Sequence, residues 1–497
     1  MSLIAARLLS LTLGRPLFAG LSFSLNSGDR LGLIAANGRG KSSLLALLAG
    51  TAEPTGGEIT RARGLTLAHV PQDVPPQLLP LTLAGAVEAA VPGEDWRAGI
   101  ALDALDVPWE LRDRPLDQLS GGWQRTALLA RAAVAEPDLY LLDEPTNHLD
   151  LARIGVLQRW LADMPKAAAV VLTSHDRAFL DAVSTRTLFL RPEASRDFAL
   201  PYSRARAALD EADAADARRH ENDMAKADQL RRQAAKLKNI GINSGSDLLV
   251  VKTRQLTERA EKIEAQTRAA HRERPAGVIR LDSAEVRAKA LVSLDGAEVR
   301  APDGRLLFRT GQKWIAPGDR VVILGPNGAG KTQLVRAVLA ACQGAAGAIR
   351  AAASLRLGHA GQMLEELDPT ATPFDLVAAE AADAVARSQL AGAGIAPDWQ
   401  GRRIAALSGG QRARLMLLLL RLRRPNFFLL DEPTNHLDID GQEALEAELQ
   451  NQDAGALLVS HDRAFIRAVG TRFWQIVSGR LDEVEGPEGF FSHEAGG

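Results

Sequence analysis

Two Gly-rich segments carry the strongest chemical signal in the sequence. The second reads Gly325-Pro-Asn-Gly-Ala-Gly-Lys331-Thr332 and follows an apolar run that ends at Leu324. Glycines let backbone N–H groups converge on phosphate oxygens, and the following helix presents its positive end to them. In such a loop the lysine meets the β and γ phosphates and the hydroxyl reaches Mg²⁺. We therefore expect nucleotide contacts from Gly325, Asn327, Gly328, Gly330, Lys331, Thr332 and Gln333.

The first half of the chain holds a second copy of this loop with one departure. It reads Ala35-Ala-Asn37-Gly38-Arg-Gly40-Lys41-Ser42-Ser43, so the opening glycine is an alanine. One alternative is that a methyl group there crowds a backbone that must approach phosphate or take an unusual φ/ψ, so that site one binds ATP more weakly or turns over more slowly. The other is that it fits without strain. Both alternatives stay open at this stage. The expected nucleotide contacts are Asn37, Gly38, Gly40, Lys41, Ser42 and Ser43.

Paired carboxylates follow an apolar run in each half. They are Asp143-Glu144 and Asp431-Glu432. After a phosphate loop, the aspartate is placed to hold Mg²⁺ and the glutamate to polarise an attacking water. His175 and His461 each lie in a Ser-His-Asp-Arg-Ala-Phe segment and are candidate γ-phosphate contacts. Three consecutive residues cannot form a hydrolase triad, so that alternative is excluded.

A third motif occurs at Leu119-Ser-Gly-Gly-Trp-Gln-Arg and at Leu407-Ser-Gly-Gly-Gln-Arg. It matches the signature of ABC ATPases, whose Ser and Gly N–H groups at a helix N-terminus cap a γ-phosphate. The signature residues are Ser120, Gly121, Gly122, Ser408, Gly409 and Gly410. The resemblance implies that each signature serves the ATP bound by the opposite half.

Two composite ATP sites follow from this resemblance. Site one would combine Lys41, Ser42, Gln72, Asp143, Glu144 and His175 with Ser408 and Gly410, and site two Lys331, Thr332, Gln362, Asp431, Glu432 and His461 with Ser120 and Gly122. Glu144, Glu432, His175 and His461 would be catalytic. The Mg²⁺ ligands would come from Ser42, Gln72 and Asp143, and from Thr332, Gln362 and Asp431. No tyrosine lies near Leu13 or Val299 to stack on adenine, and Phe18 and Phe308 are expected in the core.

The positioning elements repeat once along the chain. Lys41 and Lys331 lie 290 residues apart, Ser120 and Ser408 288, Glu144 and Glu432 288, and His175 and His461 286. Short Leu- and Val-rich runs alternate with longer Ala/Leu patterns in both halves, which predicts α/β domains with mostly parallel sheets. The fold class is therefore two phosphate-loop domains joined by an α-helical linker.

The doubled Asp-Glu-Pro-Thr-Asn-His-Leu-Asp, at 143–150 and 431–438, with Trp123 in the first signature, resembles the ABC-F family of ribosome-associated ATPases. The resemblance covers nearly the whole chain and implies cassettes at 1–203 and 277–497, with a linker at 204–276. Family members use ATP-bound closure to occupy the exit-tRNA region of the ribosome and push the linker towards the peptidyl-transferase centre. The expected function is rescue of stalled ribosomes or antibiotic resistance by ribosome protection, in a cytoplasmic monomer that pairs its own cassettes and contacts rRNA and peptidyl-tRNA.

The linker itself predicts two helices, at 204–240 and 247–270, around a tip at 239–247 rich in Asn, Gly and Ser. From Lys226 to Arg274 it holds 12 basic and six acidic residues, an excess of six positive charges in a chain of net charge −2. This excess favours RNA phosphate contact, with Lys236, Lys238, Lys252 and Arg254 as candidates. The alternative is a solvated hairpin whose cations pair with Glu258, Glu261 and Glu264.

Other function classes fit less well. A hydrophobic fraction of 46% supplies real cores, no run approaches the length of a membrane-spanning helix, and the single cysteine, Cys342, excludes an internal disulfide. A tandem-cassette ATPase of an importer with separate membrane subunits is the main alternative, although the long basic linker counts against it. A DNA-associated ABC ATPase would need a long coiled coil or zinc cysteines. Some ABC-F proteins carry an extra arm in the first cassette, between the glutamine segment and the signature. Here Gln72 to Ser120 spans 48 residues and Gln362 to Ser408 spans 46, so the near equality leaves no room for such an arm.

Overall fold

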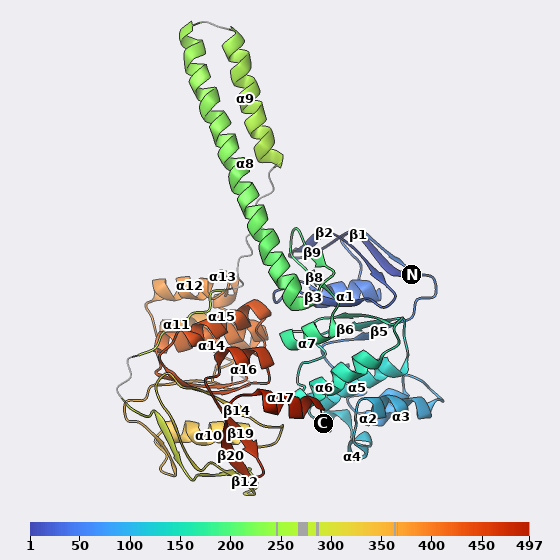
Figure 1. Cartoon of the computed structure of the whole chain (residues 1–497), viewed down its shortest axis with the longest axis vertical. Coiled ribbons are helices and arrows are strands. Elements are labelled where there is room, and N and C mark those ends of the chain that lie inside the picture. Colours follow the sequence, from blue (N-terminus) through green and yellow to red (C-terminus); the bar gives the residue numbers. More distant parts are fainter. Residues whose placement is uncertain (245–246, 267–276, 285–287, 362–363, 365, 497) are drawn as a thin grey trace.

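The chain folds into two α/β cassettes and a helical hairpin that stands away from both, as Figure 1 shows. The computed structural model describes residues 1–244, 247–266, 277–284, 288–361, 364 and 366–496. Each cassette holds a mostly parallel sheet, which confirms the predicted fold class. No helix in these ranges is both long enough and apolar enough to span a membrane.

The first cassette is built around a six-stranded sheet of order β5-β6-β7-β3-β8-β9, in which only β9 runs antiparallel to its neighbour. A second sheet, β2-β1-β4, is antiparallel. The strands are β1 (Ser2–Leu13), β2 (Arg15–Asn26), β3 (Arg30–Ile34), β4 (Gly56–Arg61), β5 (Leu67–Val70), β6 (Leu139–Leu142), β7 (Ala169–Leu172), β8 (Arg186–Phe189) and β9 (Arg196–Phe198). The helices are α1 (Lys41–Ala49), α2 (Leu83–Glu88), α3 (Asp95–Ala104), α4 (Trp109–Arg112), α5 (Gly121–Val134), α6 (Leu151–Asp163) and α7 (Arg177–Val183).

The second cassette repeats the core order as β16-β17-β18-β14-β19-β20 within an eight-stranded sheet, beside a small sheet of β13, β10 and β15. Its strands are β10 (Val292–Asp295), β11 (Glu298–Arg300), β12 (Leu306–Arg309), β13 (Gln312–Ile315), β14 (Arg320–Leu324), β15 (Ile349–Ala351), β16 (Leu357–Ala360), β17 (Phe427–Asp431), β18 (Gly455–Val459), β19 (Arg472–Val477) and β20 (Arg480–Val484). Its helices are α10 (Lys331–Cys342), α11 (Pro373–Ala378), α12 (Asp383–Gly392), α13 (Pro397–Gln400), α14 (Gly409–Arg423), α15 (Ile439–Gln450), α16 (Arg463–Val469) and α17 (Glu488–Gly496).

Both parallel sheets present their functional residues at one edge. The phosphate loops follow β3 and β14, and the carboxylate pairs end β6 and β17. Because these strands are parallel, their carboxyl ends meet at the same edge, where α/β proteins hold ligands. The repeat in the sequence is thus a repeat of sheet positions.

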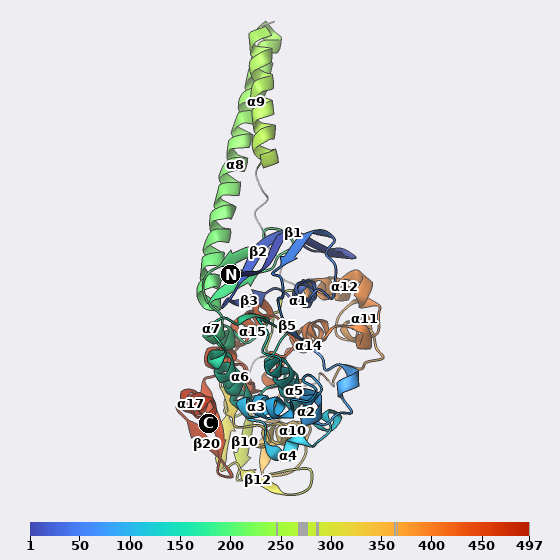
Figure 2. The same ribbon diagram turned by 90° about the vertical axis from the view of Figure 1, so that its right-hand side faces the viewer.

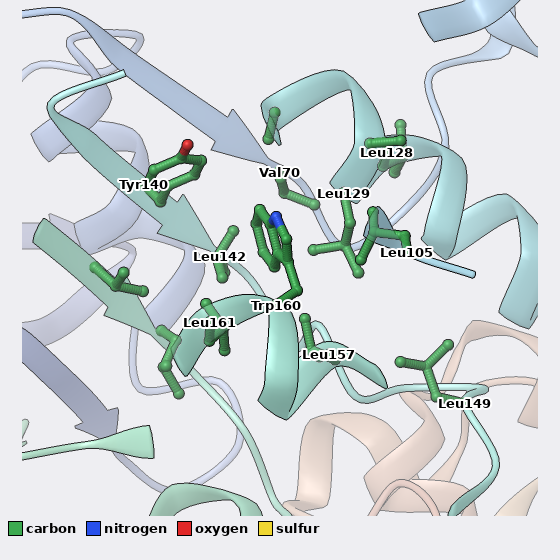
Figure 3. Packing of buried hydrophobic residues seen from close by; sticks show 14 of the residues in the cluster. Val70, Leu105, Leu128, Leu129, Tyr140, Leu142, Leu149, Leu157, Trp160 and Leu161 are labelled. Carbon is green, nitrogen blue, oxygen red and sulfur yellow. The ribbon is translucent and has the colours of Figure 1, made fainter. Parts of the chain in front are cut away.

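Apolar packing fixes the carboxylate strand of the first cassette. In Figure 3, Trp160 of α6 lies between Tyr140 and Leu142 of β6 and Leu129 of α5. The rings of Tyr140 and Trp160 meet edge to face, with centroids 5.7 Å apart. Phe18 and Phe308 are also fully buried, so the prediction that they belong to the core is confirmed.

The hairpin consists of α8 (Tyr202–Ser244) and α9 (Asp247–Gln266), which pack side by side (Figures 1 and 2). Helix α8 continues to Ser244, so the prediction that it breaks at Asn239 is wrong. One Gly in a helix costs only about 1 kcal/mol, and packing against a neighbouring helix offsets a cost of that size. Residues 267–270, predicted as the end of the second helix, lie outside the described residues.

Candidate ATP sites at the cassette interface

The two phosphate loops have the backbone that phosphate binding requires. Gly38 and Gly40 have φ of 70° and 92°, and Gly328 and Gly330 have φ of 77° and 104°. The left-handed region is open to glycine at little cost, and it lets each loop curl into the first turn of α1 or α10. Lys41 Nζ donates to Ala35 O at 3.1 Å, while Lys331 Nζ donates to Gly325 O at 2.7 Å. Each lysine therefore lies over its own loop, at a helix N-terminus.

Ala35 fits the first loop without backbone strain. The φ of Ala35 is not positive, so the alternative in which this residue must adopt an unusual φ is wrong. At the equivalent Gly325, a Cβ added to the glycine would lie 3.3 Å from Ile476 Cβ, which is closer than an ordinary van der Waals contact. The effect of Ala35 on phosphate affinity stays a prediction.

The paired carboxylates are buried at the strand ends. Glu144 and Glu432 lie at the ends of these strands with φ of 48° and 54°. Residues other than glycine seldom adopt this left-handed backbone conformation. Glu144 is only 4% exposed, and both of its carboxylate oxygens lack a hydrogen bond among the described residues. A buried carboxylate without a donor is costly unless a ligand or water uses it.

Lys41 and His175 gather around Glu144. Lys41 Nζ lies 3.7 Å and His175 Nε2 3.1 Å from Glu144 Oε1. Burial lowers the pKa of His175 against the opposing effect of Glu144, so its imidazole is neutral. In the second site, His461 Nε2 lies 3.4 Å from Glu432 Oε1, and burial together with Lys331 lowers the pKa of His461 to about 3. Burial and the charge of Asp431 raise the pKa of Glu432.

The two sites differ in what holds the aspartate. In site one, Thr173 Oγ1 donates to Asp143 Oδ1 at 2.8 Å and accepts from the Glu144 N–H at 2.7 Å. The second cassette has Val459 at this position, and the Glu432 N–H donates to the Val459 carbonyl instead. Burial raises the pKa of Asp431 there, opposed by a hydrogen bond from Thr332. Aligning the halves at an offset of 286 residues would have revealed Thr173, which sequence reasoning missed.

The signature serines lie at the N-terminal ends of α5 and α14. Ser408 accepts from the Gln411 N–H and the Gln411 side chain reaches back to the Ser408 N–H, a capping box. The Ser120 side chain makes no capping bond, and Trp123, which occupies the position of Gln411, packs under Arg153 at 3.5 Å. His148 lies against Gly121 and Gly122, and His436 against Gly409 and Gly410. Sequence reasoning missed these histidines, although the doubled Asn-His-Leu-Asp was a visible signal.

Site one joins residues of both cassettes. The Asn37 N–H donates to Asp438 Oδ2 at 2.9 Å, and Asn37 Nδ2 donates to His436 O at 2.9 Å. A Cβ added to Gly410 would lie 3.0 Å from Asn37 Nδ2, so the second signature adjoins the first phosphate loop. For site two, Asn327 makes no such bond with the part of the first cassette that the structure describes. The cross-cassette arrangement expected from the sequence is therefore present geometrically on one side.

The glutamine predictions have mixed outcomes. Gln72 is exposed, and its carbonyl accepts a hydrogen bond from the buried Arg125 of α5. Arg125 thus ties the segment after β5 to the signature helix, a role that the sequence did not suggest. Gln362 lies outside the described residues. Ser42 is exposed and Ser43, Thr332 and Gln333 are half-buried at the starts of α1 and α10. The chemical roles of all these residues stay predictions.

Arginines from outside the second cassette form ion pairs with acidic residues of α15. Arg177 contacts Glu446 directly and lies 3.8 Å from both Glu443 and Asp462. Arg206, in the second turn of α8, lies 3.0 Å from Asp440. A cavity of about 20 Å³, room for one water, is lined by Lys41, Arg206 and Asp440 among others. The base of the hairpin thus touches the second cassette directly beside site one.

Comparison with known proteins agrees with this geometry. The ABC transporter family model matches residues 18–147 and 313–435. The chain is 34% identical to the ATP-binding protein Uup of Caulobacter vibrioides, over 91% of this chain and 73% of that protein. It is 29% identical to ATP-binding cassette sub-family F member 3 of Rattus norvegicus, over 97% of this chain and 72% of that one.

A solved structure has a similar fold over almost the whole chain. The archaeal ribosome recycling factor aABCE1, in complex with the ribosomal stalk protein aP1, matches with a TM-score of 0.66. The alignment covers 98% of this chain and 92% of that one, at 19% identity. At that identity the likeness establishes the tandem-cassette fold.

Proposed function

Because this chain belongs to the ABC-F family of tandem-cassette ATP-binding proteins, we propose that it hydrolyses ATP to ADP and phosphate and acts on the ribosome through its hairpin. Its task in this proposal is to relieve stalled or drug-bound ribosomes as a cytoplasmic monomer. The observation that carries the proposal is the contact of the hairpin base, through Arg206, with the second cassette beside site one. A hairpin attached there moves when the cassettes close.

ATP binding uses residues from both halves. Lys41 and the N–H groups at the start of α1 would hold the β and γ phosphates, and the N-terminus of α14, with Ser408 and Gly410, would cap the γ-phosphate from the other side. Nucleotide then favours the closed state by its differential affinity for closed and open forms. Site two would use the equivalent set from Lys331 and Ser120.

The residues present also fit Mg²⁺. The Thr332 hydroxyl and the Asp431 carboxylate are in hydrogen-bond contact, and together they offer the oxygen ligands that Mg²⁺ prefers. Ser42 and Asp143 are the corresponding pair in site one. When bound, Mg²⁺ would neutralise charge on the phosphates.

The chemical step is attack of water on the γ-phosphorus, with ADP as the leaving group. Glu144 or Glu432 would orient the water and accept its proton, which leaves with the phosphate product. Neutral His175 and His461 would each donate a ring N–H to an oxygen of the γ-phosphate without adding charge. Loss of the γ-phosphate removes the contacts that ATP makes with both cassettes and so favours reopening.

The upper hairpin would contact RNA. Lys236, Lys238 and Lys252 are exposed and make no ion pair with a described residue, whereas Arg254 pairs with Glu258 at 2.7 Å. Three of the four predicted cations are therefore available to phosphates, and the alternative of internal pairing holds for Arg254. Leu248 at the start of α9 is 82% exposed, and Val250 and Val251 beside it are also exposed. Exposed apolar residues at the start of α9, beside the exposed lysines, suit recognition of RNA by its shape and backbone.

Sedimentation with ribosomes tests the proposal. The Glu144→Gln, Glu432→Gln double variant should pellet with 70S ribosomes in ATP and stay in the supernatant in ADP. Replacing Lys236, Lys238 and Lys252 by alanine should weaken binding and flatten its salt dependence, by about one unit of the log–log slope per lost phosphate contact.

The matched control replaces Arg204, Arg218 and Arg219, which lie low on α8, by alanine and should leave the slope unchanged. ATPase activity without ATP-dependent ribosome binding would refute the proposal. Stable association with a membrane permease would then favour the importer alternative.

A further inference from the structure

Three large apolar side chains are exposed on the helices that cover one side of the first cassette. Trp96 and Ile100 of α3 are 68% and 60% exposed, and Trp109 of α4 is 73% exposed. Trp96, Ile100 and Asp103 are spaced along one face of α3. Asp103 contacts Arg112, and Arg112 stacks on Trp109 at 3.8 Å. These contacts join the two helices into one surface, the tryptophan face, formed by Trp96, Ile100, Asp103, Trp109 and Arg112.

The second cassette shows that the fold does not need this surface. At an offset of 288 residues, Arg112 corresponds to Gln400, and both buried side chains donate to the equivalent carbonyls of Val107 and Ile395. The alignment of the two halves at this offset is therefore supported by equivalent contacts in the structure. In that register Trp96, Ile100 and Trp109 correspond to Ala384, Ser388 and Pro397. Exposed aromatic side chains that the same fold omits elsewhere indicate an interaction surface.

The charge around the tryptophan face differs in the same way. Residues 94–117 hold seven acidic and three basic side chains, whereas the equivalent 382–405 hold two acidic and three basic ones. Arg97 is engaged by Glu94 at 2.7 Å and by Glu136 at 3.2 Å. Asp95, Glu110 and Asp113 make no ion pair with any residue that the structure describes. The face is therefore aromatic and acidic, which disfavours RNA and favours a cationic partner.

We propose that the tryptophan face docks a lysine- and arginine-rich polypeptide segment of another protein. Cationic side chains would lie against the exposed indole rings, as Arg112 already does on Trp109, and their stems would cover Ile100. Asp95 and Glu110 would supply the opposite charge. Helix α4 lies far from the hairpin in both Figures 1 and 2, so the two surfaces can act at once. This inference stands whether or not the hairpin contacts RNA.

Fluorescence anisotropy with a labelled 12-residue peptide of alternating Lys, Arg and Leu tests this docking. The full-length chain should bind the peptide, and the Trp96→Ala, Ile100→Ser, Trp109→Ala variant should bind at least tenfold more weakly. Asp95→Asn with Glu110→Gln should weaken binding several-fold and reduce its salt dependence. A benzophenone-bearing peptide should crosslink to α3 or α4.

Matched controls separate docking from general attraction. Glu221→Gln with Asp223→Asn removes two exposed charges on α8, and Trp314→Ala removes an exposed tryptophan of the second cassette; both variants should bind as the unchanged chain does. Circular dichroism should find the triple variant folded, because only exposed side chains are removed. Absence of peptide binding, unaltered binding by the triple variant, or competition by single-stranded oligouridine for the crosslinked site would overturn the proposal.

Discussion

Thr173 gives site one a hydroxyl that site two lacks, and its two hydrogen bonds hold both acidic residues of the site. Thr173→Val should remove the bond to Asp143 and leave the Glu144 N–H without its partner. Buried groups that lose partners cost about 1–3 kcal/mol, so the free energy of unfolding should fall by that amount. Turnover at site one, measured in a Glu432→Gln background, should also slow.

The reverse change in the second cassette is the control for Thr173. Val459→Thr should leave stability and turnover almost unchanged, because the Glu432 N–H already donates to a backbone carbonyl. Equal losses in both variants would show that the hydroxyl has no special role in site one.

Ala35 offers a second prediction at the scale of one residue. Because its backbone is unstrained, Ala35→Gly should change the affinity of site one for ATP by less than about twofold, roughly 0.4 kcal/mol. Binding of a fluorescent ATP analogue in a Lys331→Ala background would measure it. Gly325→Ala, where a Cβ comes within 3.3 Å of Ile476, should weaken site two more. A tenfold gain from Ala35→Gly would contradict this view.

The residues of the phosphate loops, carboxylate pairs and signatures could be predicted because their chemistry depends on short local spacings. Their positions in the structure agree with those spacings. Thr173 was hidden because a threonine in an apolar strand has no motif of its own. The bonds from Asn37 to Asp438 and His436 join residues about 400 positions apart, so only the assembled cassettes reveal them.

At the scale of elements, the existence of both linker helices followed from their apolar spacing, but the end of α8 did not. Polar and Gly residues near Asn239 suggested a break, whereas α8 continues to Ser244. The attachment of α8 was also missed. In the sequence, Arg206 is one of many charges in a polar helix. Its partners Asp440 and Glu443 belong to α15, so only the structure reveals the contact.

Arg206 should therefore fix the direction of the hairpin. Spin labels at Lys226→Cys on α8 and Asp453→Cys after α15, in a Cys342→Ala background, should give a broader distance distribution when Arg206 is replaced by alanine. The ion pair is partly exposed, so its free energy is modest, about 0.5–1 kcal/mol. Arg204→Ala, an exposed neighbour without an ion pair to a described residue, should leave the distribution unchanged. An unchanged distribution in Arg206→Ala would mean that Tyr202 and Leu209, buried against the first cassette, hold the hairpin alone.

At the scale of the whole molecule, the interface is lopsided although the cassettes repeat. The acidic residues Asp440, Glu443 and Glu446 of α15 face Arg177 and Arg206. Their equivalents on α6, at an offset of 288, are Ala152, Gly155 and Gln158, which carry no charge. The ionic contacts of α15 and the hydrogen bonds of Asn37 thus gather on the side of site one. Helix α17 packs on α6 at the other side.

This lopsided interface predicts an order of nucleotide capture. Site one already has two cross-cassette hydrogen bonds from Asn37, each worth about 1 kcal/mol, so closure there costs less than at site two. After incubation with radiolabelled ATP and rapid desalting, the Glu144→Gln chain should therefore release nucleotide roughly 30-fold more slowly than the Glu432→Gln chain. Asn37→Ala removes the Nδ2 bond to His436 but keeps the backbone N–H bond to Asp438, so adding it to Glu144→Gln should reduce that difference about fivefold. Asn327→Ala in Glu432→Gln should have little effect. Slower release from Glu432→Gln would place the first closure at site two and make the contacts of Asn37 incidental to ATP capture.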